Sequence, residues 1–338
     1  MLAHWNSAHS QDYLGVILTM HFTRIDMSRN FGIGSRSMSY AGRLVLDAQA
    51  ARHILSFSSV KHYHMRWSLF CDWSGQFGVK RMEDVSWGIV QLYGCEQAVL
   101  VDLDEMKPSY AQNLVSAVNS VMSFAIGGGW LSVSPTKDCD IQKRSAVRRS
   151  APGALNWDLY IQAMIAVANQ AGPRELGVVE LARLFGLRSE EASLIDAKKA
   201  WREAQSRGYL TIREGTKGGR EREVPISSDG QREALARAAA AQGNDYSMIP
   251  VELSWKSWVA GPLRKTRDLV KEATGGGLHD LRAAYACERY AALTGHPAPC
   301  AGGRIQDRAA DLTARLTIAN ELGHGRVDVV AEYVGGRA

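Results

Sequence analysis

Six side chains in the second half of the sequence could together break and reseal a phosphodiester bond. This reaction needs a nucleophile, cationic groups that stabilise charge on the phosphate, and a proton donor for the leaving oxygen. Two arginines, two histidines, a lysine and a tyrosine could meet these needs: in chain order, they are Arg188, Lys217, His279, Arg282, His324 and Tyr333. Each residue alone is weak evidence, but the set in this order predicts a site for phosphoryl transfer.

Tyr333 is the candidate nucleophile. A phenol has a reference pKa of about 10, so it needs help to attack, but its phosphate ester conserves the energy of the broken bond. Arg188 and Arg282 are the candidates for phosphate stabilisation, because a planar and permanently charged guanidinium binds phosphate oxygens in pairs. Loss of either arginine should therefore weaken stabilisation of the transition state.

The other three residues could move or share protons. Lys217 is the candidate general acid, because the pKa of a lysine falls readily near other cations. His279 precedes Arg282 by three residues, so on a helix both project from one face, and His279 could accept or share the tyrosine proton. His324 would hydrogen-bond the phosphate from the other side.

The first part of the sequence predicts a helical domain. Apolar residues recur every three or four positions over residues 59–73 and 109–125, which is the spacing of amphipathic helices. We therefore expect a helical domain over residues 50–137. Residues 1–49 form an N-terminal extension to which the sequence assigns no role.

A second domain is expected over residues 155–338. Helical patterns cover residues 157–169 and 174–185, and the glycine that follows is a helix stop. Ser189 is expected to cap the next helix, with Glu191 in its first turn.

A small sheet is expected within this second domain. Residues alternate as strands over 209–213 and 221–226, which places Lys217 at the tip of a β-hairpin. The predicted fold class is therefore mainly α with a small antiparallel β-sheet, in two domains.

Residues 138–154 have the composition of a linker, being polar, basic and rich in serine. Their basic residues could follow a phosphate backbone, although a solvated linker would carry the same charges. Amides on the polar face of the 109–125 helix could read base edges, although a solvated face would also carry them. The DNA-binding candidates are Lys61, Arg66, Gln112, Asn113, Asn119, Lys143, Arg144, Arg148, Arg149 and Arg220.

Composition sets broad limits on the function. The formal net charge of +5 permits nucleic-acid binding without requiring it. The five cysteines are widely spaced, which argues against a disulfide framework and favours a reducing cytoplasm. His62, His64 and Cys71 are poor zinc ligands, because histidines two apart on a helix point in different directions, so no metal is expected. The early apolar run over residues 14–20 is too short to span a bilayer, so no membrane anchor is expected.

The chain resembles the tyrosine site-specific recombinases, especially the integrases of phages and integrative elements. The resemblance covers residues 155–338, where Glu191 also matches the family's acidic residue after the first arginine. It is carried by Gly186-Leu187-Arg188, Thr216-Lys217-Gly218-Gly219, His279-Asp280-Leu281-Arg282, Leu322-Gly323-His324 and Tyr333 nine residues further on.

This resemblance implies a helical core-binding domain followed by a mixed α/β catalytic domain. It implies cleavage and rejoining of double-stranded DNA at a specific attachment site, through a 3′-phosphotyrosyl intermediate and without a cofactor. It further implies a homotetramer on DNA, an accessory factor that sets direction, and a cytoplasmic, nucleoid-associated location. Two alternatives share the residues or the fold: a type IB-like topoisomerase, and a catalytically silent DNA-binding regulator.

Overall fold

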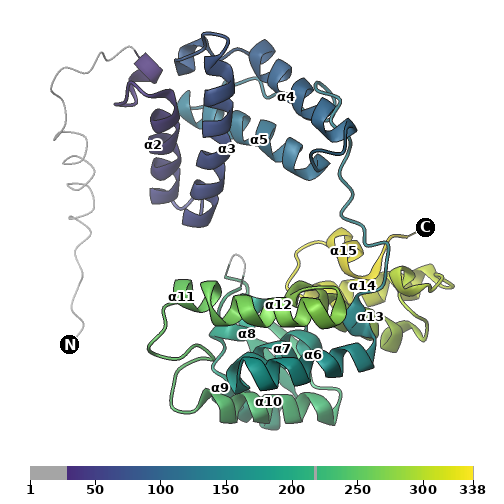
Figure 1. Cartoon of the computed structure of the whole chain (residues 1–338). Coiled ribbons are helices and arrows are strands. Elements are labelled where there is room, and N and C mark those ends of the chain that lie inside the picture. Colours follow the sequence, from purple (N-terminus) through teal and green to yellow (C-terminus); the bar gives the residue numbers. More distant parts are fainter. Residues whose placement is uncertain (1–28, 217–218, 338) are drawn as a thin grey trace, which may run out of the picture. The chain divides into compact units, whose positions relative to one another are not determined.

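The computed structural model describes residues 29–216 and 219–337, and the chain divides into two compact units. The boundary lies between Ser145 and Ala146, inside the segment that the sequence predicts as a linker. Figure 1 traces the helices and strands of both units. Each unit has its own hydrophobic core.

The first unit is built from helices. They are α2 (Met38–Ala51), α3 (Phe57–Gly75), α4 (Trp87–Asp102) and α5 (Pro108–Ala125), with the short 3-10 turns η1 (Arg29–Gly32) and η2 (Met82–Asp84). The helices α3 and α5 contain the two helices predicted from apolar spacing. Helix α2 begins within the residues assigned to the N-terminal extension and packs against α3 and α5, so it is part of this unit.

The core of the first unit is centred on Trp67, which is fully buried. Its indole nitrogen donates to the carbonyl oxygen of Met38 at 3.1 Å, where α2 begins. A Cβ atom at Gly42 would lie 2.1 Å from that nitrogen, so only glycine lets α2 approach α3 this closely. Cys139 and Ile141, from the predicted linker, are also buried in this core, so the linker begins after them.

The second unit is mainly helical. It starts with η3 (Gly153–Leu155) and continues with α6 (Trp157–Gln170), α7 (Pro173–Phe185), α8 (Ser189–Leu194), α9 (Ala197–Arg207), α10 (Asp229–Gln242), α11 (Trp255–Ala260), α12 (Pro262–Thr274), α13 (Leu278–Thr294), η4 (Pro299–Ala301), α14 (Arg308–Glu321), η5 (Asp328–Val330) and α15 (Ala331–Val334). The predicted helices over 157–169 and 174–185 are α6 and α7.

Between α9 and α10, the strands β1 (Tyr209–Ile212) and β2 (Arg222–Pro225) form a two-stranded antiparallel sheet. Leu210 pairs with Val224, and Ile212 pairs with Arg222. Together with the helices, this sheet confirms the predicted fold class.

Helix α13 organises the part of the unit that carries the candidate site. It packs against α7, α14 and α15, which lie next to Arg188, His324 and Tyr333 in the sequence. One helix thus brings together segments that are far apart in the chain. Within the described residues, none of the helices is both long and apolar enough to cross a bilayer.

Candidate active site

Arg188 is positioned by a tight passage from α7 to α8. Helix α7 ends at Gly186, whose φ of +63° is the left-handed conformation that favours glycine. The expectation that Ser189 caps the next helix is wrong, because Ser189 is already its first residue and Arg188 occupies the cap position. The bond at this helix start comes from the backbone of the cap residue: the N–H of Arg188 donates to the Glu191 carboxylate at 2.7 Å.

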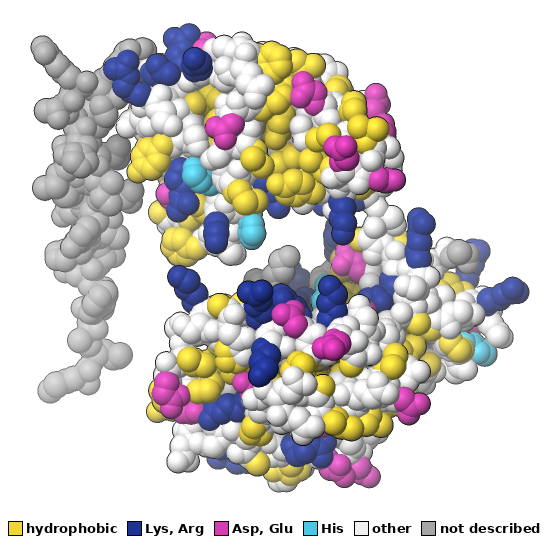
Figure 2. All heavy atoms as spheres, viewed as in Figure 1, with side chains coloured by type: hydrophobic (Ala, Val, Ile, Leu, Met, Phe, Trp, Pro, Cys, Tyr) yellow, Lys and Arg dark blue, Asp and Glu magenta, His cyan; other side chains and the backbone are white. Residues whose placement is uncertain are grey.

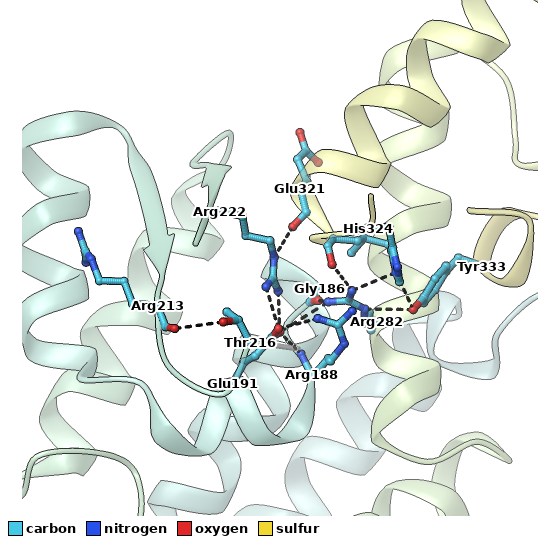
Figure 3. A network of polar contacts seen from close by, with 11 residues as sticks. Gly186, Arg188, Glu191, Arg213, Thr216, Arg222, Arg282, Glu321, His324 and Tyr333 are labelled. Atoms are coloured by element: carbon cyan, nitrogen blue, oxygen red, sulfur yellow. Dashed lines mark hydrogen bonds and ion pairs between the residues drawn. The ribbon is translucent and has the colours of Figure 1, made fainter. Parts of the chain in front are cut away.

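Glu191 is the centre of an ion-pair network (Figure 3). Its carboxylate is fully buried and accepts from the Arg188 side chain at 2.7 Å. The Arg222 guanidinium donates to both of its oxygens, at 2.7 Å and 2.6 Å. Burial alone would raise the pKa of Glu191, but the hydrogen bonds and charge of Arg222, with the Arg188 N–H and Arg282, hold it below its usual value. Glu191 is therefore ionised at neutral pH and orients the arginines around it.

Arg282 is fully buried at the base of the site. Its guanidinium donates to the backbone carbonyls of Gly186 and Leu322, and one nitrogen lies 3.7 Å from the Glu191 carboxylate. Burial lowers the pKa of Arg282 to about 10, so it remains charged at neutral pH. These bonds tie together the three segments that carry Arg188, Arg282 and His324.

Tyr333 lies on α15, and its side chain enters this network. Its hydroxyl oxygen is 3.4 Å from Nε of Arg282 and 3.1 Å from Nε2 of His324. The Arg282 guanidinium carbon also lies 5.5 Å from the centre of the tyrosine ring. Tyr333 is only 2% exposed, so its hydroxyl contacts the site residues rather than solvent.

The contacts of the two histidines with Tyr333 differ from those expected from the sequence. His324 hydrogen-bonds the tyrosine hydroxyl. His279 is exposed, and its ring centre lies 5.4 Å from that of Tyr333 without a hydrogen bond among the described residues. The reason is local: Gly323 turns the chain after α14 so that His324 reaches the hydroxyl, whereas His279 is in the first turn of α13. His324 is therefore the better candidate to accept the tyrosine proton.

The surroundings of both histidines favour the neutral imidazole. Burial and the positive charges of Arg282, Arg188 and Arg222 lower the pKa of His324 to about 4. His279 keeps an exposed side, but partial loss of water around the ring and the charges of Arg282, Arg148 and Arg188 lower its pKa as well. A neutral imidazole can accept a proton, which a charged one cannot.

Arg222 is a site residue that the sequence analysis did not single out, although it lies within the expected strand over residues 221–226. It lies on β2, is 7% exposed, and donates to the carbonyl oxygen of Glu321 at 2.8 Å. The sequence did contain a signal for this position. Arg222 and the buried Val224 are two residues apart in the strand, so their side chains face the same side. Arg222 links Glu191 to the segment that carries His324.

Gly323 is required where the segment that carries His324 meets Arg222. Its φ is +67°, and a Cβ atom there would lie 2.9 Å from Cδ of Arg222. The glycine of the Leu322-Gly323-His324 motif therefore serves both the turn and the close approach.

Arg220 lies near His324, whereas Lys217 lies outside the described residues. A Cβ atom at Gly325 would lie 2.4 Å from a guanidinium nitrogen of Arg220, so this side chain rests on the backbone next to His324. Arg220, Arg222 and His324 line an open pocket between β2 and the end of α14. The general-acid role of Lys217 stays a prediction from the sequence.

The basic residues of the predicted linker are not equivalent. Lys143, Arg144 and Arg149 are exposed, as a role in DNA contact requires. Arg148 instead pairs with Asp280 at 2.6 Å, and its backbone N–H donates to the carbonyl of Ala331 at 2.9 Å. Arg148 is thus held next to α13 and α15 by this ion pair and backbone bond. Figure 2 shows Lys and Arg side chains gathered along the upper edge of the second unit.

The candidates in the first unit also divide into two groups. Gln112 donates to the carbonyl of Gln142 at 2.7 Å, and Asn119 bonds Val133 through both its carbonyl and its N–H, so both amides hold the segment after α5 rather than facing solvent. The Asn113 side chain makes no hydrogen bond with any other described residue. Lys61 is exposed and Arg66 is half-buried, both on α3. Of the three candidate amides, only that of Asn113 is without a hydrogen bond among the described residues.

Comparison with known proteins gives a family and a fold. Residues 144–288 match the family model described as Integrase. The lambda integrase dimer bound to a COC′ core site has a TM-score of 0.54 at 16% identity, with 97% of this chain and 85% of that chain covered. The Tn1549 transposon integrase in complex with transposon right end DNA has a TM-score of 0.56 at 10% identity, with coverage of 88% and 95%.

XerH recombinase in its post-cleavage complex with a palindromic difH substrate has a TM-score of 0.55 at 13% identity, with coverage of 88% and 81%. No curated protein sequence matches the chain. At these identities the solved structures establish the fold, and the integrase match runs from the segment before α6 through both strands and α12 into α13. Residues 144–288 thus match the Integrase family model, and the chain has the fold of the integrase and recombinase structures named above.

Proposed function

We propose that this protein is a tyrosine recombinase that cleaves and rejoins double-stranded DNA through a 3′-phosphotyrosyl intermediate on Tyr333, and that it thereby integrates or excises a mobile element such as a prophage or an integrative conjugative element. One observation carries the proposal: the Tyr333 hydroxyl lies between Nε of Arg282, at 3.4 Å, and Nε2 of His324, at 3.1 Å. A nucleophile, a cation and a neutral base thus share one site.

Cleavage would begin when His324 accepts the tyrosine proton and the phenolate oxygen attacks the phosphorus. The bond to the 5′ oxygen breaks, and the 3′ phosphate becomes an ester of Tyr333. Arg188 and Arg282 would bind the non-bridging oxygens as their charge increases. Lys217 is the sequence-based candidate to protonate the leaving oxygen.

Rejoining would reverse these steps with a different DNA strand. The 5′ hydroxyl of the partner strand attacks the phosphotyrosyl phosphorus, the ester bond to Tyr333 breaks, and the phenolate regains a proton from His324. The number of phosphodiester bonds is unchanged, so the energy of the first bond is returned in the second.

Tyr333 must become accessible before a phosphate can reach it, because the residue is only 2% exposed. The hydroxyl is held by hydrogen bonds, and α15 comprises only the residues Ala331–Val334. We infer that DNA binding moves this short helix, or the side chain alone, so that the scissile phosphate takes the place of the hydroxyl next to Arg282.

The partners we propose are a specific attachment site in duplex DNA and three further copies of the chain. The support is by likeness: lambda integrase has been described as a tetramer bound to a Holliday junction, and its fold is shared. Exposed Lys143, Arg144 and Arg149 would supply phosphate contacts, so affinity should fall with salt. An accessory factor would set the direction of recombination.

A supercoiled plasmid that carries two copies of the attachment site separates the proposal from its alternatives. A recombinase deletes or inverts the segment between the sites. A type IB-like topoisomerase would leave relaxed plasmid of unchanged sequence, and a silent regulator would bind without changing the plasmid. Deletion or inversion that is lost in Tyr333→Phe supports the proposal, and either other result contradicts it.

A further inference from the structure

Two buried cysteines contact the residue that carries the candidate nucleophile. Cys287 lies on α13 and Cys300 on η4, and their sulfur atoms are 3.5 Å apart. The carbonyl oxygen of Tyr333 lies 3.5 Å from the sulfur of Cys287 and 3.4 Å from that of Cys300. In the reduced protein, one thiol can donate to the other, and the second can donate to Tyr333.

We propose that Cys287 and Cys300 form a redox modification site, at which a peroxide converts the dithiol to a disulfide and thereby displaces Tyr333. The proposed reaction mechanism leaves both thiols unused, and their burial at 2% and 7% exposure distinguishes them from incidental surface cysteines. The effect on DNA cleavage rests on the proposed function, whereas disulfide formation itself does not.

Cys300 is the thiol expected to react first. The thiol of Cys287 donates a hydrogen bond to it, and Arg148 and Arg315 add positive charge nearby, so the pKa of Cys300 is lowered. The hydrogen bond with Cys300 raises the pKa of Cys287, which keeps its proton. A thiolate is the form that attacks peroxides, and Cys300 is also the more exposed of the two.

The chemistry balances with hydrogen peroxide as the oxidant. The Cys300 thiolate attacks one peroxide oxygen, the O–O bond breaks, and Cys300 becomes a sulfenic acid while hydroxide leaves and takes up the proton lost by Cys300. The sulfur of Cys287 then attacks the sulfur of Cys300, the S–S bond forms, and the S–O bond breaks. The hydroxyl leaves as water with the proton of Cys287. Two thiols and one peroxide thus give one disulfide and two waters.

The disulfide should move Tyr333 for two reasons. A disulfide bond is about 2.05 Å long, so the sulfurs must approach by roughly 1.5 Å from their present 3.5 Å. Oxidation also removes the S–H donor from the Tyr333 carbonyl. A displacement of about 1 Å at a reacting group can cost on the order of 10²-fold in rate.

The test compares one full-length protein in its reduced and peroxide-treated forms. Free thiols are blocked after treatment, and mass spectrometry of tryptic peptides then detects a link between positions 287 and 300. Covalent capture of nicked duplex DNA measures the reaction of Tyr333, and hydrogen exchange of residues 331–337 measures its position. We expect the linked peptide, at least tenfold slower capture, faster exchange, and recovery of all three with dithiothreitol.

Control variants separate this pair from other cysteines. Cys287→Ser with Cys300→Ser keeps two hydroxyl donors and should retain capture while losing its response to peroxide. Cys95 and Cys139 lie next to each other in the first unit. Cys95→Ser removes one thiol of this second pair and should leave the response to peroxide intact. A thermal melt checks that each variant folds.

Each failure has its own meaning. Absence of the 287–300 link after peroxide treatment overturns the modification site. A complete link with unchanged exchange over residues 331–337 overturns control of Tyr333, whatever the DNA reaction shows. A reduced protein that never captures DNA contradicts the proposed function, while the peptide and exchange measurements still decide this inference.

Discussion

The Nε2 atom of His324 lies 3.1 Å from the hydroxyl oxygen of Tyr333, and both residues stand in one network with Arg282. Because the surroundings of His324 lower its pKa to about 4, its imidazole is neutral near pH 7 and can accept the phenol proton. The structure thus places a neutral imidazole from the Leu322-Gly323-His324 segment next to the proposed nucleophile, whereas His279 contacts only the ring of Tyr333.

The two histidines should therefore differ in their effect on DNA cleavage. We expect His324→Ala to slow formation of the covalent DNA adduct by on the order of 10²-fold or more, which is the usual range for loss of a general base. His279→Ala should cost less than about tenfold, because His279 contacts the ring of Tyr333 without a hydrogen bond. Single-turnover adduct formation measures both rates. A larger effect of His279→Ala would assign the base to His279.

Removal of Arg222 should destabilise the protein more than removal of a less buried arginine, Arg213, on the same hairpin. Arg222→Met leaves the fully buried Glu191 carboxylate without its bidentate partner, so the free energy of unfolding should fall by about 3–5 kcal/mol. Arg213→Met is the matched control, because Arg213 pairs with Glu203 at 31% and 21% side-chain exposure and should cost less than about 1 kcal/mol. Urea denaturation measures both. Equal losses would show that Glu191 does not depend on Arg222.

Gly323→Ala should impair catalysis beyond its effect on stability. Both Gly323, at φ +67°, and Gly208, at φ +75°, have left-handed backbones, so alanine at either position should cost about 1–2 kcal/mol. Only at Gly323 does the added Cβ meet Arg222, at 2.9 Å, whereas nothing lies within 4 Å at Gly208. Adduct formation should fall in Gly323→Ala and persist in Gly208→Ala, after both variants are shown to fold. Similar activity in the two variants would refute the role of this contact.

Acid should destabilise the folded protein partly through His324. Its pKa is lowered to about 4 in the folded chain and is about 6.5 when unfolded, so the unfolded chain binds the proton more tightly. The contribution of His324 to stability is therefore complete above about pH 6.5 and is lost as the pH falls towards 4. We expect His324→Gln to lose less stability than the unmodified protein between about pH 7 and about pH 5 in urea titrations. An identical loss in both proteins would contradict a half-buried His324 that is neutral in the folded chain.

The sequence predicted the fold and the nature of the site more fully than it predicted the contacts. Apolar spacing located α3, α5, α6 and α7, because periodicity depends on local sequence and on which face is buried. It did not place α2, which precedes the recognised pattern. The sequence also identified the motif residues Arg282, His324 and Tyr333, which the fold brings together.

What the sequence did not predict was how polar side chains are shared between distant segments. From the sequence alone, Arg222 looks like a surface charge, but in the structure it bonds Glu191 and the carbonyl oxygen of Glu321. Arg148 reads as a linker charge until Asp280 is seen beside it. Such pairings depend on tertiary contacts that no local pattern encodes.

Covalent capture of DNA tests the central claim most directly. Tagged protein is incubated in EDTA with a pool of nicked duplexes whose central sequence is randomised, washed under denaturing conditions, and the DNA that stays attached is sequenced. If Tyr333 forms a phosphotyrosyl bond, the unmodified protein will retain an enriched sequence that also reveals the attachment site, and Tyr333→Phe will retain none. Equal retention by the two proteins, or no retention above background by either, would contradict the account.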